Sequence, residues 1–135
     1  SDEDIEKMRA LGELIGIAFQ IRDDLFDYDL QGDIGKPTGI DIKEKKLTLP
    51  LIYVLNNANN SDRKMIIDVV KNHNEEPDRV KEVIDYVISN GGIEYATTKM
   101  HEYKDKALEL LRTLPENPAR ESLEELVLYT IERKK

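Results

Sequence analysis

The stretch Gly16–Asp27, with the sequence GIAFQIRDDLFD, carries three carboxylates at helical positions i, i+1 and i+4. These are Asp23, Asp24 and Asp27, and the mainly apolar residues before them are typical of a helix surrounded by other helices. Like charges at this spacing destabilise a helix by about 0.2–0.5 kcal/mol per pair in water, and by more where they are desolvated. A hard divalent cation would offset that repulsion, because Mg²⁺ prefers oxygen ligands and combines one or two carboxylates with substrate phosphates. The stretch therefore predicts metal-bridged diphosphate chemistry.

The composition limits the class of protein around this motif. The 135 residues correspond to one domain, residues 1–135, with no cysteine for a disulfide framework or a thiolate metal site. The net charge of -8 argues against a nucleic-acid partner. The longest apolar stretch, Leu47–Leu55, is interrupted by Thr48 and Pro50 and is too short for a membrane span. With no secretory leader at the start of the sequence, we expect a cytoplasmic protein.

The helical period dominates the sequence, and no long alternation of β-branched residues suggests a sheet, so we predict an all-α helical bundle. Thr48, Ser61 and Asn117 are the expected N-caps, and Val80, Val83 and Val87 belong to an apolar stripe. The helices are expected over residues 3–28, 48–56, 61–71, 93–114 and 118–135, with a further one that begins at residue 77 and ends at residues 91–92. Residues 29–46 are expected to be non-helical.

The motif and the residues that follow it closely resemble one known family. After Gly16–Asp27 come Gly32-Asp33, then Gly35–Ile42 (GKPTGIDI), then Lys45–Pro50 (KKLTLP). In order and spacing these match the second aspartate-rich motif of the trans-isoprenyl diphosphate synthases, or polyprenyl synthetases, and the stretch after it. The resemblance is specific over about residues 11–55. It implies an isoprenoid synthase fold of which this chain is the C-terminal part, because the family's first aspartate-rich motif is absent.

The resemblance also implies a role for each matching residue. Asp23, Asp24 and Asp27 would bind, directly or through water, a Mg²⁺ ion that holds an allylic diphosphate. Lys36 and Lys46 would contact the same diphosphate as point charges, with Asp23, Asp24 and Lys36 forming the catalytic set.

Phe19 and Gln20 would line the cavity in which the allylic carbon ionises and isopentenyl diphosphate attacks head to tail. Metal and lysine charges would stabilise the leaving diphosphate, while apolar helices exclude water from the carbocation. The resemblance further implies a homodimer of the full-length enzyme. We expect the 135-residue chain alone to be inactive, because it holds one diphosphate clamp of two.

Other interpretations of the same residues remain open at this stage. The carboxylates could form a solvated acidic face. Residues 27–38 imitate a calcium loop, but Thr38 replaces its final glutamate and Pro37 prevents an exiting helix there. A terpene cyclase would use similar carboxylates, although its Asn and Ser or Thr ligands are not found after Asp27. A non-catalytic helical interaction module is the alternative from a different class.

Overall fold

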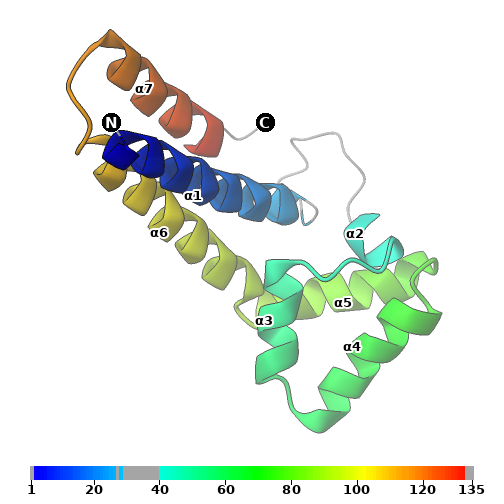
Figure 1. The fold of residues 1–135 in the computed structure, drawn as a ribbon. Helices are drawn as coiled ribbons and strands as arrows, with labels where there is room; N and C mark the ends of the chain where they lie inside the picture. Colours follow the sequence, from blue (N-terminus) through cyan, green and yellow to red (C-terminus); the bar gives the residue numbers. More distant parts are fainter. Residues whose placement is uncertain (1, 27, 29–39, 133–135) are drawn as a thin grey trace. The chain divides into compact units, whose positions relative to one another are not determined.

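A computed structural model describes residues 2–26, 28 and 40–132, and within those residues it contains helices and no strands. The prediction of an all-α chain is confirmed. The helices, coloured along the sequence in Figure 1, are α1 (Asp2–Phe26), α2 (Ile40–Lys43), α3 (Leu49–Asn57), α4 (Asn60–Asn72), α5 (Pro77–Ser89), α6 (Gly92–Leu111) and α7 (Pro118–Glu132). The chain divides into two compact units, one formed by Asp23–Thr97 and the other by Ser1–Arg22 with Thr98–Lys135.

The unit Asp23–Thr97 has its core between α3, α4 and α5. The predicted stripe on α5 is buried at Val80, Val83 and Val87, because residues at i, i+3 and i+7 lie on one face of a helix. Other members of the same core are Tyr28, Ile42, Leu51, Val54, Ile66, Val69 and Val70. Antiparallel pairing of α4 with α5 therefore buries the apolar face of each against the other (Figure 1).

Asparagine side chains cap the N-termini of α4 and α7. The side chain of Asn59 accepts a hydrogen bond from the Asp62 N–H at 2.8 Å, so α4 is capped by Asn59 and the predicted cap at Ser61 is wrong. Asn59 has the extended backbone that a cap residue needs, and Ser61 already lies inside the helix. The cap predicted at Asn117 is confirmed, since its side chain accepts from the Arg120 N–H at 2.9 Å.

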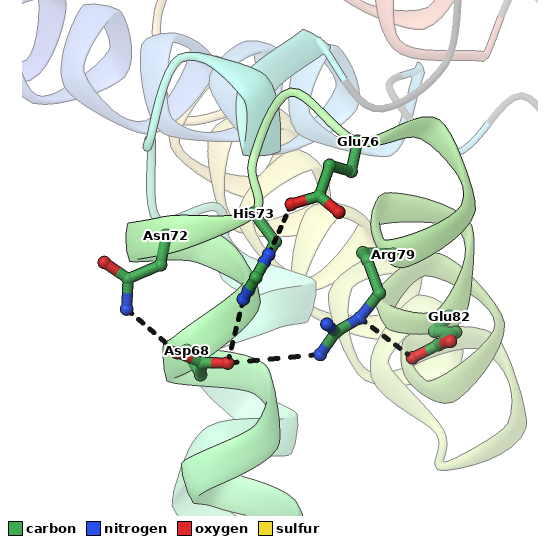
Figure 2. Close-up of polar contacts among 6 residues, drawn as sticks. All are labelled: Asp68, Asn72, His73, Glu76, Arg79 and Glu82. Atoms are coloured by element: carbon green, nitrogen blue, oxygen red, sulfur yellow. Dashed lines mark hydrogen bonds and ion pairs between the residues drawn. The ribbon is translucent and has the colours of Figure 1, made fainter.

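Polar side chains hold the connections on both sides of α4. Arg63 donates from Nε to the Leu55 carbonyl and from Nη2 to the Ala58 carbonyl, both at 3.0 Å, which fixes the end of α3 against α4. At the other end of α4, Figure 2 shows the His73 ring between two carboxylates. Its Nδ1 contacts Glu76, and its Nε2 lies 3.3 Å from Asp68 Oδ2. Asn72, Arg79 and Glu82 extend this network across the turn from α4 to α5. These contacts join the end of α4 to the start of α5.

The short helix α2 was not expected, because residues 29–46 were predicted to be non-helical. It ends in a Schellman arrangement, in which the Lys46 N–H donates to the Asp41 carbonyl at 2.7 Å and the Lys45 N–H to the Ile42 carbonyl at 2.9 Å. Lys45 has φ 63°, the left-handed conformation that glycine usually supplies at this position. The buried side chain of Ile42 anchors the helix to the core, and this tertiary contact outweighs the local turn signals.

A glycine pair makes the corner between α5 and α6. Gly91 has φ +83°, which suits a residue without a side chain. At Gly92 an added Cβ would lie 2.9 Å from the Pro50 carbonyl oxygen and 2.7 Å from Val87 Cγ1. The start of α6 therefore lies directly against the first turn of α3.

The other unit consists of α1 beside α6 and α7, as Figure 1 shows. Leu11 packs against Ala107 and Leu111, with Leu123 of α7 at the edge of the cluster. The prediction that α1 is surrounded by helices is wrong for this chain, because Ile17 is 41% exposed and Phe19 is 37% exposed. Among the described residues, no atom lies within 4 Å of a Cβ added at Gly12 or Gly16. α1 thus has one covered face and one open face.

Candidate functional site

The carboxylates Asp23 and Asp24 lie in the last turn of α1 and differ in environment. The side chain of Asp23 is exposed, whereas Asp24 is half-buried. The Leu49 N–H, 25 residues further along the chain, donates a hydrogen bond to Asp24 Oδ2 at 3.2 Å. The end of α1 and the start of α3 are therefore tied together through one of the two carboxylates.

A second contact joins the same two segments. Tyr28 is 2% exposed, and its hydroxyl lies 3.3 Å from Thr48 Oγ1 in the core. Its N–H donates to the Leu25 carbonyl at 3.0 Å, which turns the chain just after α1. The contact between the two hydroxyls was not predicted, because Thr48 was expected to cap α3 and Tyr28 was given no role. A tyrosine placed directly after an acidic motif was the available signal, because a buried tyrosine hydroxyl usually finds a polar partner.

Lys46 is the described lysine of the predicted site, and it lies on the segment that leads into α3. Its Nζ is 3.1 Å from Glu44 Oε2, and the side chain is exposed. The hydrogen bond to Glu44, the charge of Glu44, and then the charges of Asp41 and Asp24 raise the pKa of Lys46 above its ordinary value. Lys46 is therefore an exposed cationic side chain that forms an ion pair with Glu44.

The predicted cavity residues Phe19 and Gln20 belong to the other compact unit, and both are exposed. The guanidinium of Arg22, a buried residue, lies 5.4 Å from the centre of the Phe19 ring. That distance is within the range of a cation–π contact, so Phe19 is part of a local pair on α1. Asp27 and Lys36, which complete the predicted constellation, lie outside the described residues.

The carboxylate oxygens of Asp23 and Asp24 are suitable ligands for a hard cation, but the described residues do not form a complete metal site. Within the described part of the chain, no group of three histidine, aspartate or glutamate side chains could hold a metal ion. Asp23 and Asp24 offer oxygen ligands only, which fits the preference of Mg²⁺ for one or two carboxylates completed by water and phosphate. A cation bound by such an open pair has positions left for the oxygens of a diphosphate.

The helices of the described residues include none with the length and hydropathy of a membrane span.

The profile of the polyprenyl synthetase family matches residues 1–87 of this sequence. The chain belongs to the polyprenyl synthetase family. It is 33% identical over 129 residues to solanesyl-diphosphate synthase 2, chloroplastic, of Oryza sativa subsp. japonica, an alignment that covers 95% of this chain and 31% of the rice protein. Against octaprenyl diphosphate synthase of Escherichia coli the identity is 31%, over 97% of this chain and 41% of the bacterial protein.

Solved structures of polyprenyl synthetases share the fold over nearly the whole chain. Geranylgeranyl pyrophosphate synthase from Bacteroides thetaiotaomicron superposes with a TM-score of 0.86 and 41% identity, over 98% of this chain and 44% of that protein. A polyprenyl synthase from Caulobacter crescentus CB15, complexed with calcium and isoprenyl diphosphate, gives a TM-score of 0.82 and 28% identity. That match covers 96% of this chain and 40% of the Caulobacter protein. The chain thus spans less than half the length of each of these relatives.

Proposed function

We propose that this chain supplies one half of the active site of a trans-prenyltransferase, which extends an allylic diphosphate with isopentenyl diphosphate. The relatives named as solanesyl and octaprenyl diphosphate synthases support the reaction class. The observation that carries the proposal is the placement of Asp24 and Lys46. The Leu49 N–H donates to Asp24 Oδ2, so the carboxylate pair lies beside the segment that carries Lys46, although the two are far apart in the sequence.

The proposed roles follow from the charge and exposure of each side chain. Asp23 and Asp24 would hold Mg²⁺, and Lys46 would contact the diphosphate of the allylic substrate as a point charge. When bound, Mg²⁺ would neutralise charge on the departing diphosphate. Lys46 would add to that stabilisation, because a lysine side chain is protonated at neutral pH. Asp27 and Lys36 stay in the proposed site on the strength of the sequence motif.

Phe19 and Gln20 are proposed to border the reacting hydrocarbon. A ring that faces a substrate cavity excludes water from a carbocation and stabilises its charge through the π face. The contact of Arg22 with the Phe19 ring supports a fixed orientation for that ring.

Incorporation of radiolabelled isopentenyl diphosphate tests the reaction. The complete gene product that contains this sequence should transfer label to dimethylallyl, geranyl or farnesyl diphosphate in the presence of Mg²⁺. Asp23→Asn should lower kcat by roughly 10²–10³, the loss typical for one electrostatic stabiliser of a transition state. Glu109→Gln is the matched control, since Glu109 is an exposed carboxylate on α6, and it should leave kcat unchanged.

Two results would contradict the proposal. One is the absence of incorporation with every allylic diphosphate, and the other is full activity of the Asp23→Asn protein. Cyclic products formed without isopentenyl diphosphate would instead identify a terpene cyclase. The 135-residue chain alone should show no incorporation, because it supplies only one half of the proposed site.

The oligomeric state and the cellular location of the complete protein are further expectations. A homodimer remains the expected state of the complete protein, which light scattering of the gene product tests directly. The cytoplasmic location predicted from the sequence stays a prediction, because the names of relatives include chloroplastic and mitochondrial proteins.

A further inference from the structure

The N-terminus of α3 is capped from a distant part of the chain. Thr48 occupies the N-cap position with an extended backbone, yet its side chain makes no capping hydrogen bond. The first N–H groups of a helix have no partner inside the helix and need an acceptor. Asp24 Oδ2 accepts the Leu49 N–H at 3.2 Å and supplies that acceptor. A carboxylate is also the favoured group at the positive end of the helix dipole.

The neighbouring contacts explain why Asp24 has this position. The Thr48 hydroxyl lies 3.3 Å from the buried Tyr28 hydroxyl, so it is directed to Tyr28 instead of to the first turn of α3. α4 and α7 differ in this respect, because Asn59 and Asn117 cap them from the adjacent sequence position. In α3 the acceptor is a side chain 25 residues away, and it binds the N–H of the first helical residue.

The first turn of α3 is itself held from another side. The space at Gly92 is so small that an added Cβ would lie 2.9 Å from the Pro50 carbonyl oxygen. Gly92 packs against Pro50 and the Tyr28 hydroxyl lies beside Thr48, and the hydrogen bond that Asp24 accepts from Leu49 adds a contact between these two positions. The Oδ2 atom of Asp24 accepts the hydrogen bond from Leu49, whereas the side chain of Asp23 is exposed.

We propose that Asp24 has a positioning role besides its place in the carboxylate pair, because it caps α3 and so holds the segment that carries Lys46, while Asp23 is the carboxylate whose charge the cation requires. The two adjacent aspartates thus have different roles. The cap stands on the hydrogen bond alone. Its consequence for catalysis rests on the proposed prenyltransferase function.

Hydrogen exchange of the Leu49 amide in the 135-residue chain tests the cap, with circular dichroism of each variant to verify folding. Asp24→Ala should speed exchange at Leu49 about tenfold, as expected for the loss of an N-cap. Asp24→Asn keeps a carbonyl acceptor in place and should stay within about threefold of the wild type. Asp23→Ala is the matched control and should leave the Leu49 amide unchanged. Wild-type exchange in the Asp24→Ala chain, or equal acceleration by Asp23→Ala, would overturn the assignment.

Leu49→Pro provides a second variant if Asp24→Ala fails to fold. Proline is tolerated at the first position of a helix, and the extended backbone of Thr48 suits the residue before a proline. The substitution removes the donor N–H and leaves both aspartates intact. A positioning role predicts that Leu49→Pro lowers kcat/KM of the complete gene product about tenfold. If Asp24 acts only as a metal ligand, kcat/KM and the Mg²⁺ concentration for half-activation should equal those of the wild type, and the assignment is overturned.

Rescue by the conservative variant separates positioning from ligation. Asp24→Asn should recover about tenfold in kcat/KM over Asp24→Ala, because it restores the cap. Asp23→Asn should recover nothing over Asp23→Ala, because the charge itself is needed there. Equal activities of Asp24→Asn and Asp24→Ala would refute the positioning role. A wild-type protein without any prenyltransfer would refute the proposed function and leave the exchange result valid.

Discussion

Helices α4 and α1 both carry a row of apolar residues, but α4 buries most of its row within its own unit, whereas α1 leaves more of its row exposed. Ile66 and Val69 of α4 are fully buried against α5 and α3. On α1, Leu11 is buried on one face, while Ile5 is 69% exposed and Phe19 is 37% exposed on the rest of the surface. Apolar periodicity alone therefore does not show whether a helix face packs within the chain or remains open.

The two regions also differ in how their polar groups are satisfied. Around α4, the Asn59 cap and the His73 network join residues that are close in the sequence. At the end of α1, Asp24 and Tyr28 contact Leu49 and Thr48, which lie at least 20 residues away. Contacts between residues close in the sequence hold the turn from α4 to α5, whereas long-range contacts hold the end of α1. The carboxylate pair therefore lies where the end of α1 contacts the start of α3.

The largest effect expected from this comparison concerns identical substitutions in the two helices. Ile66→Ala should lower the free energy of unfolding by about 2–5 kcal/mol, because Ile66 is fully buried and its truncation leaves a cavity. Ile5→Ala should change it by less than about 0.5 kcal/mol, since Ile5 is exposed. Urea denaturation followed by circular dichroism measures both. Equal losses would show that the exposed face of α1 is covered in solution.

Glycine substitutions give the next largest contrast, with opposite signs. Gly92→Ala should destabilise the chain by about 1–3 kcal/mol, because its Cβ meets the backbone at Pro50 and the Val87 side chain. Gly16→Ala should stabilise it by about 0.5–1 kcal/mol through helix propensity, because an added Cβ there has no described neighbour within 4 Å. Thermal unfolding of the two variants checks the signs. A stabilising Gly92→Ala change would contradict the close approach of α6 to α3.

A smaller effect tests the local cap of α4. Asn59→Ala should cost about 1 kcal/mol, because the Asp62 N–H loses its acceptor. Ser61→Ala is the matched control within the same turn, and it should leave the unfolding midpoint in urea almost unchanged. If Ser61→Ala costs more than Asn59→Ala, Ser61 is the cap after all.

The smallest effect is a change of pH dependence at Tyr86, which joins α5 to α4. Burial, and then the hydrogen bond that its hydroxyl donates to Asp62 at 2.9 Å, raise the pKa of Tyr86 above its usual value. The unfolded chain therefore loses this proton first as the pH rises. The contribution of Tyr86 is complete below the unfolded pKa and is lost as the pH rises through the folded pKa.

Comparison of wild type with Tyr86→Phe between about pH 8 and about pH 11 isolates this contribution. The stability difference between the two proteins should shrink as the pH increases, as judged from urea midpoints at each pH. A difference that stays constant or grows would show that the Tyr86 hydroxyl is not held by Asp62.

Local signals in the sequence predicted the helices with strong periodicity, and tertiary contacts decided the exceptions. The stripe of Val80, Val83 and Val87 marked α5 correctly because helical spacing and burial coincide there. α2 was not predicted, because its four residues lie among turn-forming neighbours. The burial of Ile42, which the sequence does not show, stabilises this helix. The cap of α4 was misplaced by two residues because Asn59 and Ser61 are both good cap residues, and only the backbone geometry selects one.

The sequence by itself determined the family, the all-α class and the carboxylates of the candidate site, because these depend on residue type and on spacing along one helix. Only the tertiary structure decided that Asp24 caps α3, that Tyr28 faces Thr48, and that Gly92 lies against Pro50. These contacts join segments far apart in the chain, and neither periodicity nor a local motif contains the distance between such segments. For the same reason, the sequence does not show that the adjacent Asp23 and Asp24 differ in exposure.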